Sequence, residues 1–559
     1  MTGKILHLWI TSIFVGILLG FFGATAAHYF REGLYLVETF SKEYFANTTN
    51  FIFLFFSLSI AASITHFIKK HFKINRWEGP ADTIYAAHRT DNELNVKTGI
   101  ASTLAAFISA AGGASVGQYG PLVHFGATLG ACIKAFLKLR ITTDVVIGGG
   151  VAAAISAGFN APLAGIVFAH EAILRHFSTK ALAPIALASG TAFAIHNYLW
   201  VASTPFLQEY PPTEIGSMIL VSIAAGPFFG LIAIIFMSVV ITFAKLPTKM
   251  GLTSFQSLII AITGLSIIGN FYPEVMGLGT LSIKTLTSEH ALLMVALAIL
   301  IAKILATALS LGFGFFGGVF SPALLVGAAA GAVATGVVNW TNLHSFQGPE
   351  LVICGMAAVA GAVIGAPLSM IIIVLELTGS YGLALSTTVG IVTATMISSQ
   401  LFGNSIFDKQ LLGRGIDISQ GRMGLRLMEE GISSITSMQT LKFSPDMKVE
   451  LVKLTMIDHE STEAYIVTEG DKYVGKLHLL SLAVADPHKK IIEFVDKNAL
   501  NLKSDASLQQ AIEAAANFIG ETIPVIDRSD DKFIGTVNEG DIFKLYLELQ
   551  GQTIDLEKK

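Results

Sequence analysis

The sequence predicts an all-α membrane domain that crosses the bilayer several times, followed by a soluble α/β domain. The chain is too apolar for an ordinary soluble protein, with a mean hydropathy of +0.64 and 14% charged residues. Its charge is also uneven, because residues 1–420 hold 37 charged side chains whereas the much shorter stretch 421–559 holds 39. We therefore expect the membrane domain over 1–420, a linker over 421–434 and the soluble domain after it.

The first apolar run, 8–30, is long enough to span about 30 Å of hydrocarbon, and we expect a retained span rather than a cleaved signal peptide. Several later apolar segments are shorter and broken by glycine, which is typical of tilted or half-way helices. Positive charge gathers in three loops, and by the positive-inside rule these loops and both termini are cytoplasmic, in a cell membrane. The loop residues are Lys69, Lys70, Lys73 and Arg76; Lys134, Lys138 and Arg140; and Lys245 and Lys249.

A glycine-dense stretch, 112–126, separates two apolar segments and carries no formal charge. Pro121 stands where a helix would begin, so the N–H groups of Gln118, Tyr119 and Gly120 are expected to be unpaired. Such a helix end carries roughly half a positive charge and can bind an anion without a cationic side chain. At membrane depth it predicts an ion site.

An internal repeat supports this interpretation. Residues 150–165 align without a gap to residues 355–370, and Glu171 then falls opposite Glu376. A second glycine-rich break, 317–322, precedes the second copy as the first break precedes the first. Repeat 1 is expected over about 5–205 and repeat 2 over about 214–416, although similar composition alone is the simpler alternative.

Two similar units are expected in the soluble domain, at 435–486 and 487–550. In the second unit, 522–527 and 532–537 read as strands joined by a turn. Asp541 then reads as the cap of a helix. The first unit shows the same order, with strands expected over 464–467 and 473–477.

These motifs resemble the CLC family of chloride channels and transporters, followed by a pair of CBS domains. The family's Gly-Lys/Arg-Glu-Gly-Pro motif corresponds to residues 117–121, its Gly-x-Phe-x-Pro motif to 318–322, and its pore tyrosine to Phe407. The resemblance implies an inverted repeat, a homodimer in the lipid bilayer and one chloride path in each subunit. It also implies an anion site built from Gly117, Gln118, Tyr119, Gly120, Gly318, Val319, Phe320 and Phe407.

The departures from the family pattern bear on mechanism. Tyr119 replaces the gating glutamate, Ala172 replaces the inner proton-relay glutamate of exchangers, and Phe407 removes a hydroxyl donor. A phenol has a pKa near 10, so it stays neutral and cannot mimic an anion. Either Trp77 or Glu78 stands in for the family's central serine, and Glu78 is expected to face the cytoplasmic vestibule or to pair with Arg76.

The leading hypothesis is therefore a passive chloride channel with chloride as its bound substrate, and not an enzyme. Tyr119 is the candidate gate, with a space-filling aromatic as the alternative. The main rival is a coupled chloride/proton antiporter that relays protons through His124, His170 or Glu171. For the two histidines the simpler alternative is a neutral, hydrogen-bonded group, and we expect Glu171 and Glu376 to be structural or interfacial caps.

A second rival is a CBS pair that binds an adenine nucleotide, with Asp541 on the ribose, and regulates anion transport. The alternative for Asp541 is a plain helix cap. The sequence predicts no metal site, and it predicts no nucleic-acid partner.

Overall fold

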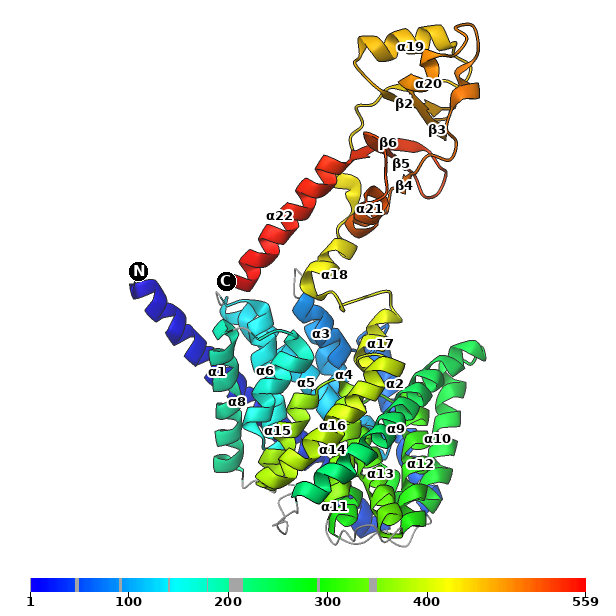
Figure 1. Cartoon of the computed structure of the whole chain (residues 1–559). Helices are drawn as coiled ribbons and strands as arrows, with labels where there is room; N and C mark the ends of the chain where they lie inside the picture. The colour runs from blue at the N-terminus through cyan, green and yellow to red at the C-terminus, as the bar shows by residue number, and fades with distance from the viewer. Residues whose placement is uncertain are drawn as a thin grey trace. The chain divides into compact units, whose positions relative to one another are not determined.

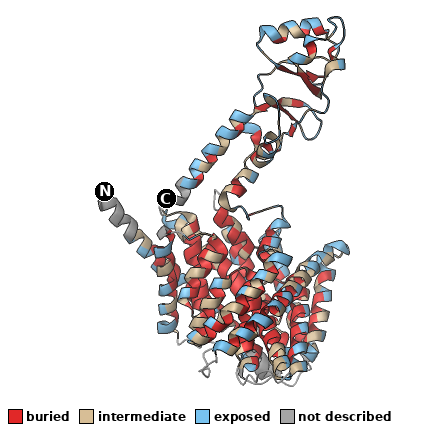
Figure 2. Ribbon diagram, viewed as in Figure 1, coloured by how far each residue is buried: buried red, intermediate tan, exposed pale blue. Residues whose placement is uncertain are grey.

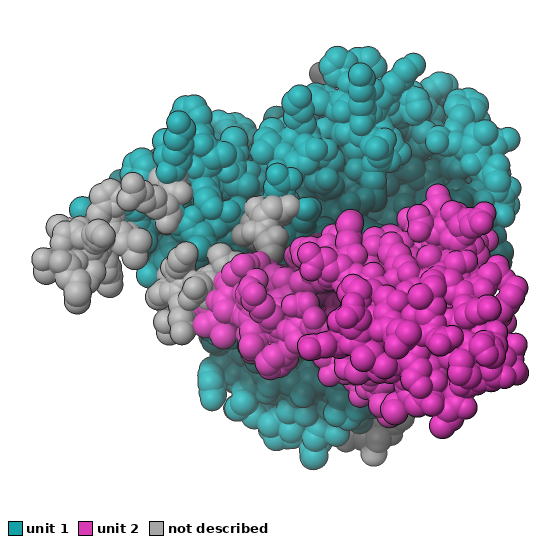
Figure 3. All heavy atoms as spheres, turned by 90° about the horizontal axis from the view of Figure 1, so that it is seen from above, with its two compact units in different colours: residues 1–416 teal, residues 417–559 magenta. Residues whose placement is uncertain are grey.

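The chain forms two compact units, residues 1–416 and 417–559 (Figure 3). The boundary lies a few residues before the expected one. This computed structural model describes residues 2–45, 50–89, 93–138, 141–177, 179–200, 215–288, 292–340 and 349–558. Arg140 and the expected repeat boundaries at 205 and 214 lie outside these ranges.

The first unit is entirely helical in its described part (Figure 1). Eight of its described helical segments are long and apolar enough to cross a membrane, and five more are apolar but shorter. The elements are α1 (Thr2–Phe45), α2 (Asn50–His71), α3 (Pro80–His88), α4 (Val96–Ala111), α5 (Tyr119–Leu137), α6 (Thr143–Phe159), α7 (Pro162–Phe168), the π-helix η1 (Ala169–Leu174), α8 (Thr179–Leu199), α9 (Ile215–Lys249), α10 (Ser254–Phe271), the 3-10 turn η2 (Pro273–Val275), α11 (Thr280–Ser288), α12 (Leu293–Gly312), α13 (Phe320–Trp340), α14 (Glu350–Ile364), α15 (Pro367–Thr378), α16 (Tyr381–Leu401) and α17 (Ile406–Leu412).

Burial follows the pattern of a membrane protein. Small residues fill the interior, and α6 and α14 are buried along nearly their whole length (Figure 2). Large apolar side chains stand on the outer helices, such as Phe56 on α2 and Phe255 on α10, which are 63% and 72% exposed. Exposed apolar surface on this scale is stable where lipid rather than water covers it.

The internal repeat is present in the fold. Helices α6 and α7 correspond to α14 and α15, and the equivalent residues Asn160 and Gly365 both end a helix in the left-handed conformation, with φ of 57° and 76°. The carboxylate of Glu171 accepts hydrogen bonds from the amides of Leu368 and Ser369, at 2.8 and 2.7 Å.

The second repeat makes the equivalent contact with the first repeat. Glu376 accepts hydrogen bonds from the amides of Leu163 and Ala164, at 2.9 and 2.8 Å. Each glutamate therefore caps the N-terminus of the other repeat's short helix, where free amides and the helix dipole favour an anion. The expectation that both are structural caps is confirmed.

The second unit contains two three-stranded sheets, ordered β1-β2-β3 and β4-β5-β6. In each sheet the first pair is parallel and the second antiparallel, which confirms the expected strand–turn–strand order. The final helix begins at Glu539, two residues before the expected cap at Asp541. The elements are α18 (Gly421–Glu429), η3 (Ile432–Ile435), β1 (Lys442–Phe443), α19 (Val449–Asp458), β2 (Glu463–Val467), β3 (Tyr473–His478), α20 (Leu479–Ala483), η4 (Ile491–Phe494), β4 (Leu502–Lys503), α21 (Leu508–Ala515), β5 (Thr522–Ile526), β6 (Phe533–Asn538) and α22 (Glu539–Lys558).

A buried ion pair joins the two halves of the soluble unit. Glu463 lies 2.7 Å from the Lys476 ammonium and also accepts hydrogen bonds from the amides of Glu521 and Thr522. Burial alone would raise the pKa of Glu463, but Lys476 and these amides outweigh burial and hold that pKa below its ordinary value. The carboxylate therefore stays charged at neutral pH, and its hydrogen bonds hold β2 next to β5.

The reciprocal caps make a testable prediction. Glu376→Ala leaves the amides of Leu163 and Ala164 without their acceptor, and each unpaired amide costs about 1–3 kcal/mol. We therefore expect the purified variant to have a lower apparent melting temperature in detergent than the parent. Size-exclusion chromatography is the measurement that monitors this melting. Glu274→Ala, which removes an exposed glutamate, is the control, and equal melting of both variants would contradict the capping role.

Candidate functional site

The two glycine-rich breaks meet in the structure. The Gly117 N–H donates to the Gly318 carbonyl at 2.7 Å, and the Gly318 N–H donates to the Gly117 carbonyl at 2.8 Å. A Cβ added at Gly117 would lie 2.9 Å from the Gly318 oxygen, and one at Gly318 would lie 2.9 Å from the Gly120 nitrogen. Only glycine allows the backbones to come this close.

This bridge brings two helix N-termini together, those of α5 and α13. Helix α5 begins at Tyr119 and α13 at Phe320, so in both the proline lies within the first turn rather than at its start. The expectation of a free Gln118 amide is wrong, since that amide donates to the Ser321 hydroxyl at 3.3 Å. For the amides of Tyr119, Gly120, Val319 and Phe320, the described residues supply no acceptor.

A stack of aromatic rings includes the first residue of each helix, Tyr119 and Phe320. Tyr119 is 2% exposed, and its ring lies 3.8 Å from that of Phe159 at an interplanar angle of 18°. Phe320 contacts both rings, at 5.4 and 5.2 Å, and Phe168 follows at 6.2 Å from Phe320. Sequence reasoning missed Phe159 and Phe168, although Phe159 comes just before the repeated Ala-Pro-Leu motif.

Phe407 lies at the start of α17 and is buried. Within the described part of the chain, no ring contact joins it to the Tyr119 stack. Its helix is held by the Ser405 hydroxyl, which caps the Asp408 amide, and by an ion pair between Asp408 and Arg175 at 2.7 Å. The structure therefore supports its burial in the membrane unit.

Asp82 on α3 makes two ion pairs, one with the loop before α3 and one with the residues after α17. Asp82 lies 2.7 Å from the Arg76 guanidinium and 2.8 Å from that of Arg414, which comes 332 residues later. The expected pairing of Arg76 with Glu78 is therefore wrong.

Glu78 faces a histidine instead. Its carboxylate oxygen lies 3.6 Å from Nε2 of His124, whose Nδ1 lies 2.8 Å from the Thr83 hydroxyl. His124 is fully buried one turn beyond the start of α5, whereas the Glu78 side chain keeps 21% exposure. The three residues form a chain of polar groups that leads inward from an accessible carboxylate.

The other candidate relay groups, Glu171 and His170, are engaged in structural hydrogen bonds. Both carboxylate oxygens of Glu171 accept hydrogen bonds from α15, and Ala172 is buried and carries no titratable group. His170 is buried, with Nδ1 at 3.0 Å from the His176 carbonyl. These contacts favour the structural alternative for Glu171 and His170.

One buried charge was missed by sequence reasoning. Lys303 is wholly buried in α12 and donates to the carbonyls of Val275 and Gly277, at 2.9 and 3.1 Å. The Ser115 hydroxyl donates to the same Val275 carbonyl. Lys303 thus anchors the backbone that leads into Gly117, and a lone lysine within an apolar run was the available signal.

In the soluble unit, Asp541 pairs with its own helix start. Its carboxylate accepts from the Asn538 amide, and its N–H donates to the Asn538 side chain, both at 2.7 Å. Asn538 thus caps α22 and Asp541 lies in its first turn, so the expected N-cap at Asp541 is wrong, although its contact with Asn538 favours a structural role over a ribose site. A search of the described residues finds no cluster of metal-binding side chains.

Comparisons with known proteins bear on both units. The family model described as "Voltage gated chloride channel" matches residues 61–399, more than half of the chain, and a CBS domain model matches 491–548. Chloride channel protein CLC-f of Arabidopsis thaliana is 26% identical over 79% of this chain and 56% of its own length. The H(+)/Cl(-) exchange transporter ClcA of Vibrio cholerae is 28% identical over 54% of this chain and 66% of its own. The chain thus spans less than two thirds of either relative.

Solved structures show the same fold. A slow cyanobacterial Cl-/H+ antiporter superposes with a TM-score of 0.64 at 20% identity, over 73% of this chain and 97% of its own. A eukaryotic CLC transporter superposes with a TM-score of 0.60 at 17% identity, over 97% of this chain and 99% of its own.

The bridge makes a testable prediction. Gly318→Ala places a methyl group 2.9 Å from the Gly120 nitrogen, against backbone that cannot move aside easily. Overpacking of this kind costs about 1–3 kcal/mol, so we expect a lower apparent melting temperature. Gly190→Ala in α8 is the control, because nothing lies within 4 Å of its added Cβ. Unchanged melting of the Gly318 variant would show that the two breaks are not packed as described.

Proposed function

Because the chain belongs to the voltage gated chloride channel family, we propose that it conducts chloride passively across a cell membrane, through one path in each subunit of a homodimer. The observation that carries the proposal is the meeting of two helix N-termini at Gly117 and Gly318, with four amides free to face an anion. In this proposal Gly117, Gln118, Gly120, Val319, Phe320 and Phe407 line the path, Tyr119 gates it, and both termini are cytoplasmic.

Passive flow is preferred to exchange on two grounds. The positions that resemble the gating and relay glutamates of exchangers hold Tyr119 and Ala172, which carry no charge. Tyr119 is also packed against the rings of Phe159 and Phe320, and a phenol there does not ionise at working pH, so it cannot shuttle protons as a carboxylate does. The nearest remaining carboxylate of the relay region, Glu171, is held by three hydrogen bonds from α15.

A coupled antiporter is the second candidate, supported by Glu78 and His124. An accessible carboxylate 3.6 Å from a buried imidazole is a plausible start for a proton path, since ionisable groups inside membranes are commonly functional. Relatives named as exchangers add weight to it. Regulation by an adenine nucleotide in the CBS pair receives less support, because Asp541 is engaged with Asn538.

A flux measurement decides between channel and antiporter. The purified protein is reconstituted into liposomes with a chloride gradient, and chloride release and internal pH are recorded together. Passive conduction predicts chloride release with no proton movement against its own gradient. Uphill proton movement driven by chloride would contradict the channel proposal, and its selective loss in Glu78→Gln would then establish the carboxylate as the proton entry.

The gate is tested separately. Tyr119→Ala removes the ring that stacks on Phe159, and we expect chloride flux to rise several-fold at equal protein. Tyr119→Phe is the matched control, because it keeps the ring and removes only the hydroxyl, so its flux should stay near that of the parent. A flux that is unchanged or lower in the alanine variant would show that the ring does not obstruct the path.

A further inference from the structure

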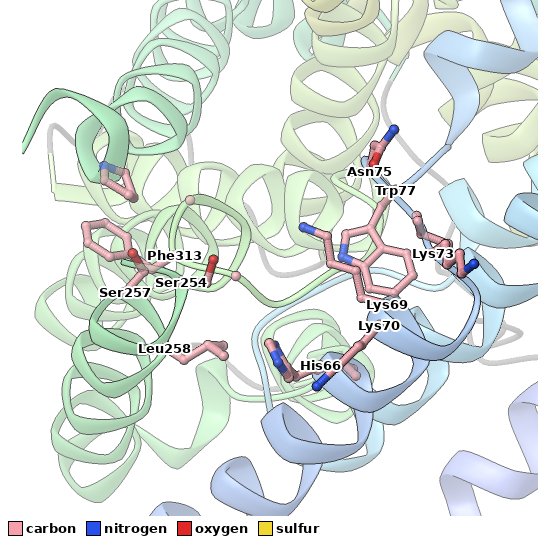
Figure 4. A pocket seen from close by; sticks show the side chains of 15 residues that line it. His66, Lys69, Lys70, Lys73, Asn75, Trp77, Ser254, Ser257, Leu258 and Phe313 are labelled. Carbon is pink, nitrogen blue, oxygen red and sulfur yellow. The ribbon is translucent and has the colours of Figure 1, made fainter. Parts of the chain in front are cut away.

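A cavity of about 610 Å³ lies beside the anion path and is not used by it. One wall is the end of α2 and the loop after it, and the opposite wall comes from the ends of α9 and α12 and the start of α10 (Figure 4). His66, Lys69 and Lys70 stand on the first wall, while Ser254, Ser257 and Phe313 stand across from them.

The charge of this cavity is strongly one-sided. Lys69, Lys70, Lys73 and His66 line it, and its lining includes no aspartate or glutamate. The described part of the chain places no carboxylate within ion-pair distance of these three lysines. The Ser254 hydroxyl adds a donor suited to a phosphate, whereas the Ser257 hydroxyl donates to the Thr253 carbonyl at 3.0 Å. The first turn of α10 adds the positive end of a helix dipole.

The surroundings of the cavity distinguish a lipid from a soluble phosphate. Helix α2 carries a stripe of exposed apolar side chains, mainly on a different face from the residues that line the cavity: Ile52, Phe56, Ile60, Ile64 and Phe67. Helix α10 carries a second stripe, on the face away from Ser254 and Ser257, formed by Phe255, Ile259, Ile267 and Phe271. Lys70 lies ten residues beyond Ile60, which is about 15 Å along the helix. When the stripes lie at the depth of the acyl chains, the basic groups therefore lie at the depth of the lipid headgroups.

We propose that this cavity binds the phosphate headgroup of an anionic membrane lipid, with its acyl chains in the lipid that covers the outer faces of α2 and α10. Basic pockets between membrane helices on the cytoplasmic side have the chemistry for such headgroups. The site is connected to the anion path, because Trp77 lines the cavity and its ring lies 5.7 Å from that of Phe316, next to the Gly317–Gly318 break. The inference does not depend on whether the chain is a channel or an antiporter.

Native mass spectrometry of the full-length protein in detergent tests the proposal, with phosphatidic acid and phosphatidylcholine of matched chains as probes. The parent should retain phosphatidic acid at least about tenfold more tightly than phosphatidylcholine. The triple variant Lys69→Gln, Lys70→Gln, Lys73→Gln should lose that preference. A triple of equal charge change in the soluble unit, Lys448→Gln, Lys472→Gln, Lys497→Gln, should keep it.

A second variant tests whether the effect of the triple variant reflects only a general loss of positive charge. Ser254→Asp places a carboxylate on the opposite wall, in the first turn of α10 where an acidic residue favours the helix. It should also lose the preference while melting like the parent. Retention of phosphatidic acid by both variants would overturn the proposal. Displacement of the lipid by glycerol 3-phosphate at equal concentration would overturn the lipid assignment in favour of a soluble phosphate.

Discussion

The structure of the membrane unit depends on the pair of hydrogen bonds between Gly117 and Gly318. Each break alone would be a strained interruption of an apolar segment, with amides that lipid cannot satisfy. Paired, the two breaks satisfy one N–H and one carbonyl of each glycine, while the amides of Tyr119, Gly120, Val319 and Phe320 keep no acceptor among the described residues. This contact requires that neither glycine carries a side chain, because a Cβ added at either one would come too close to the backbone of the other break.

The rest of the unit holds this bridge in place by exchanging contacts between the repeats. Glu171 caps α15 and Glu376 caps α7, so each half completes the other's short helix. Lys303 and Ser115 share the Val275 carbonyl and fix the backbone that enters the first break. Glu171, Glu376 and Lys303 are thus paired with main-chain groups, which compensate for the hydration that these charges lose.

Much of this could be predicted from the sequence. The charge asymmetry, the gapless repeat and the two glycine-proline breaks were sufficient to predict the helical membrane unit, the duplication and the meeting of the breaks, because each depends on local chain chemistry. Long-range partners were not readable. Nothing near Glu78 in the sequence indicates His124, and Asp82 meets Arg414 only because α3 and α17 lie together. The first helical residue at each break was also misplaced, since proline is tolerated throughout the first turn and not only at its start.

The aromatic stack explains why a neutral residue can occupy the gate position. Phe159 and Phe320 contact Tyr119, and Phe168 contacts Phe320, so the Tyr119 ring has largely apolar surroundings. In the proposed channel the phenol, which buries its ring at little cost, would obstruct the path by volume rather than by charge. Obstruction by volume is relieved by moving a side chain, whereas obstruction by charge is relieved by a proton. If Tyr119 is the gate, as proposed, anion movement is separated from protonation at that position, and the Glu78–His124 pair is then the candidate route for proton dependence.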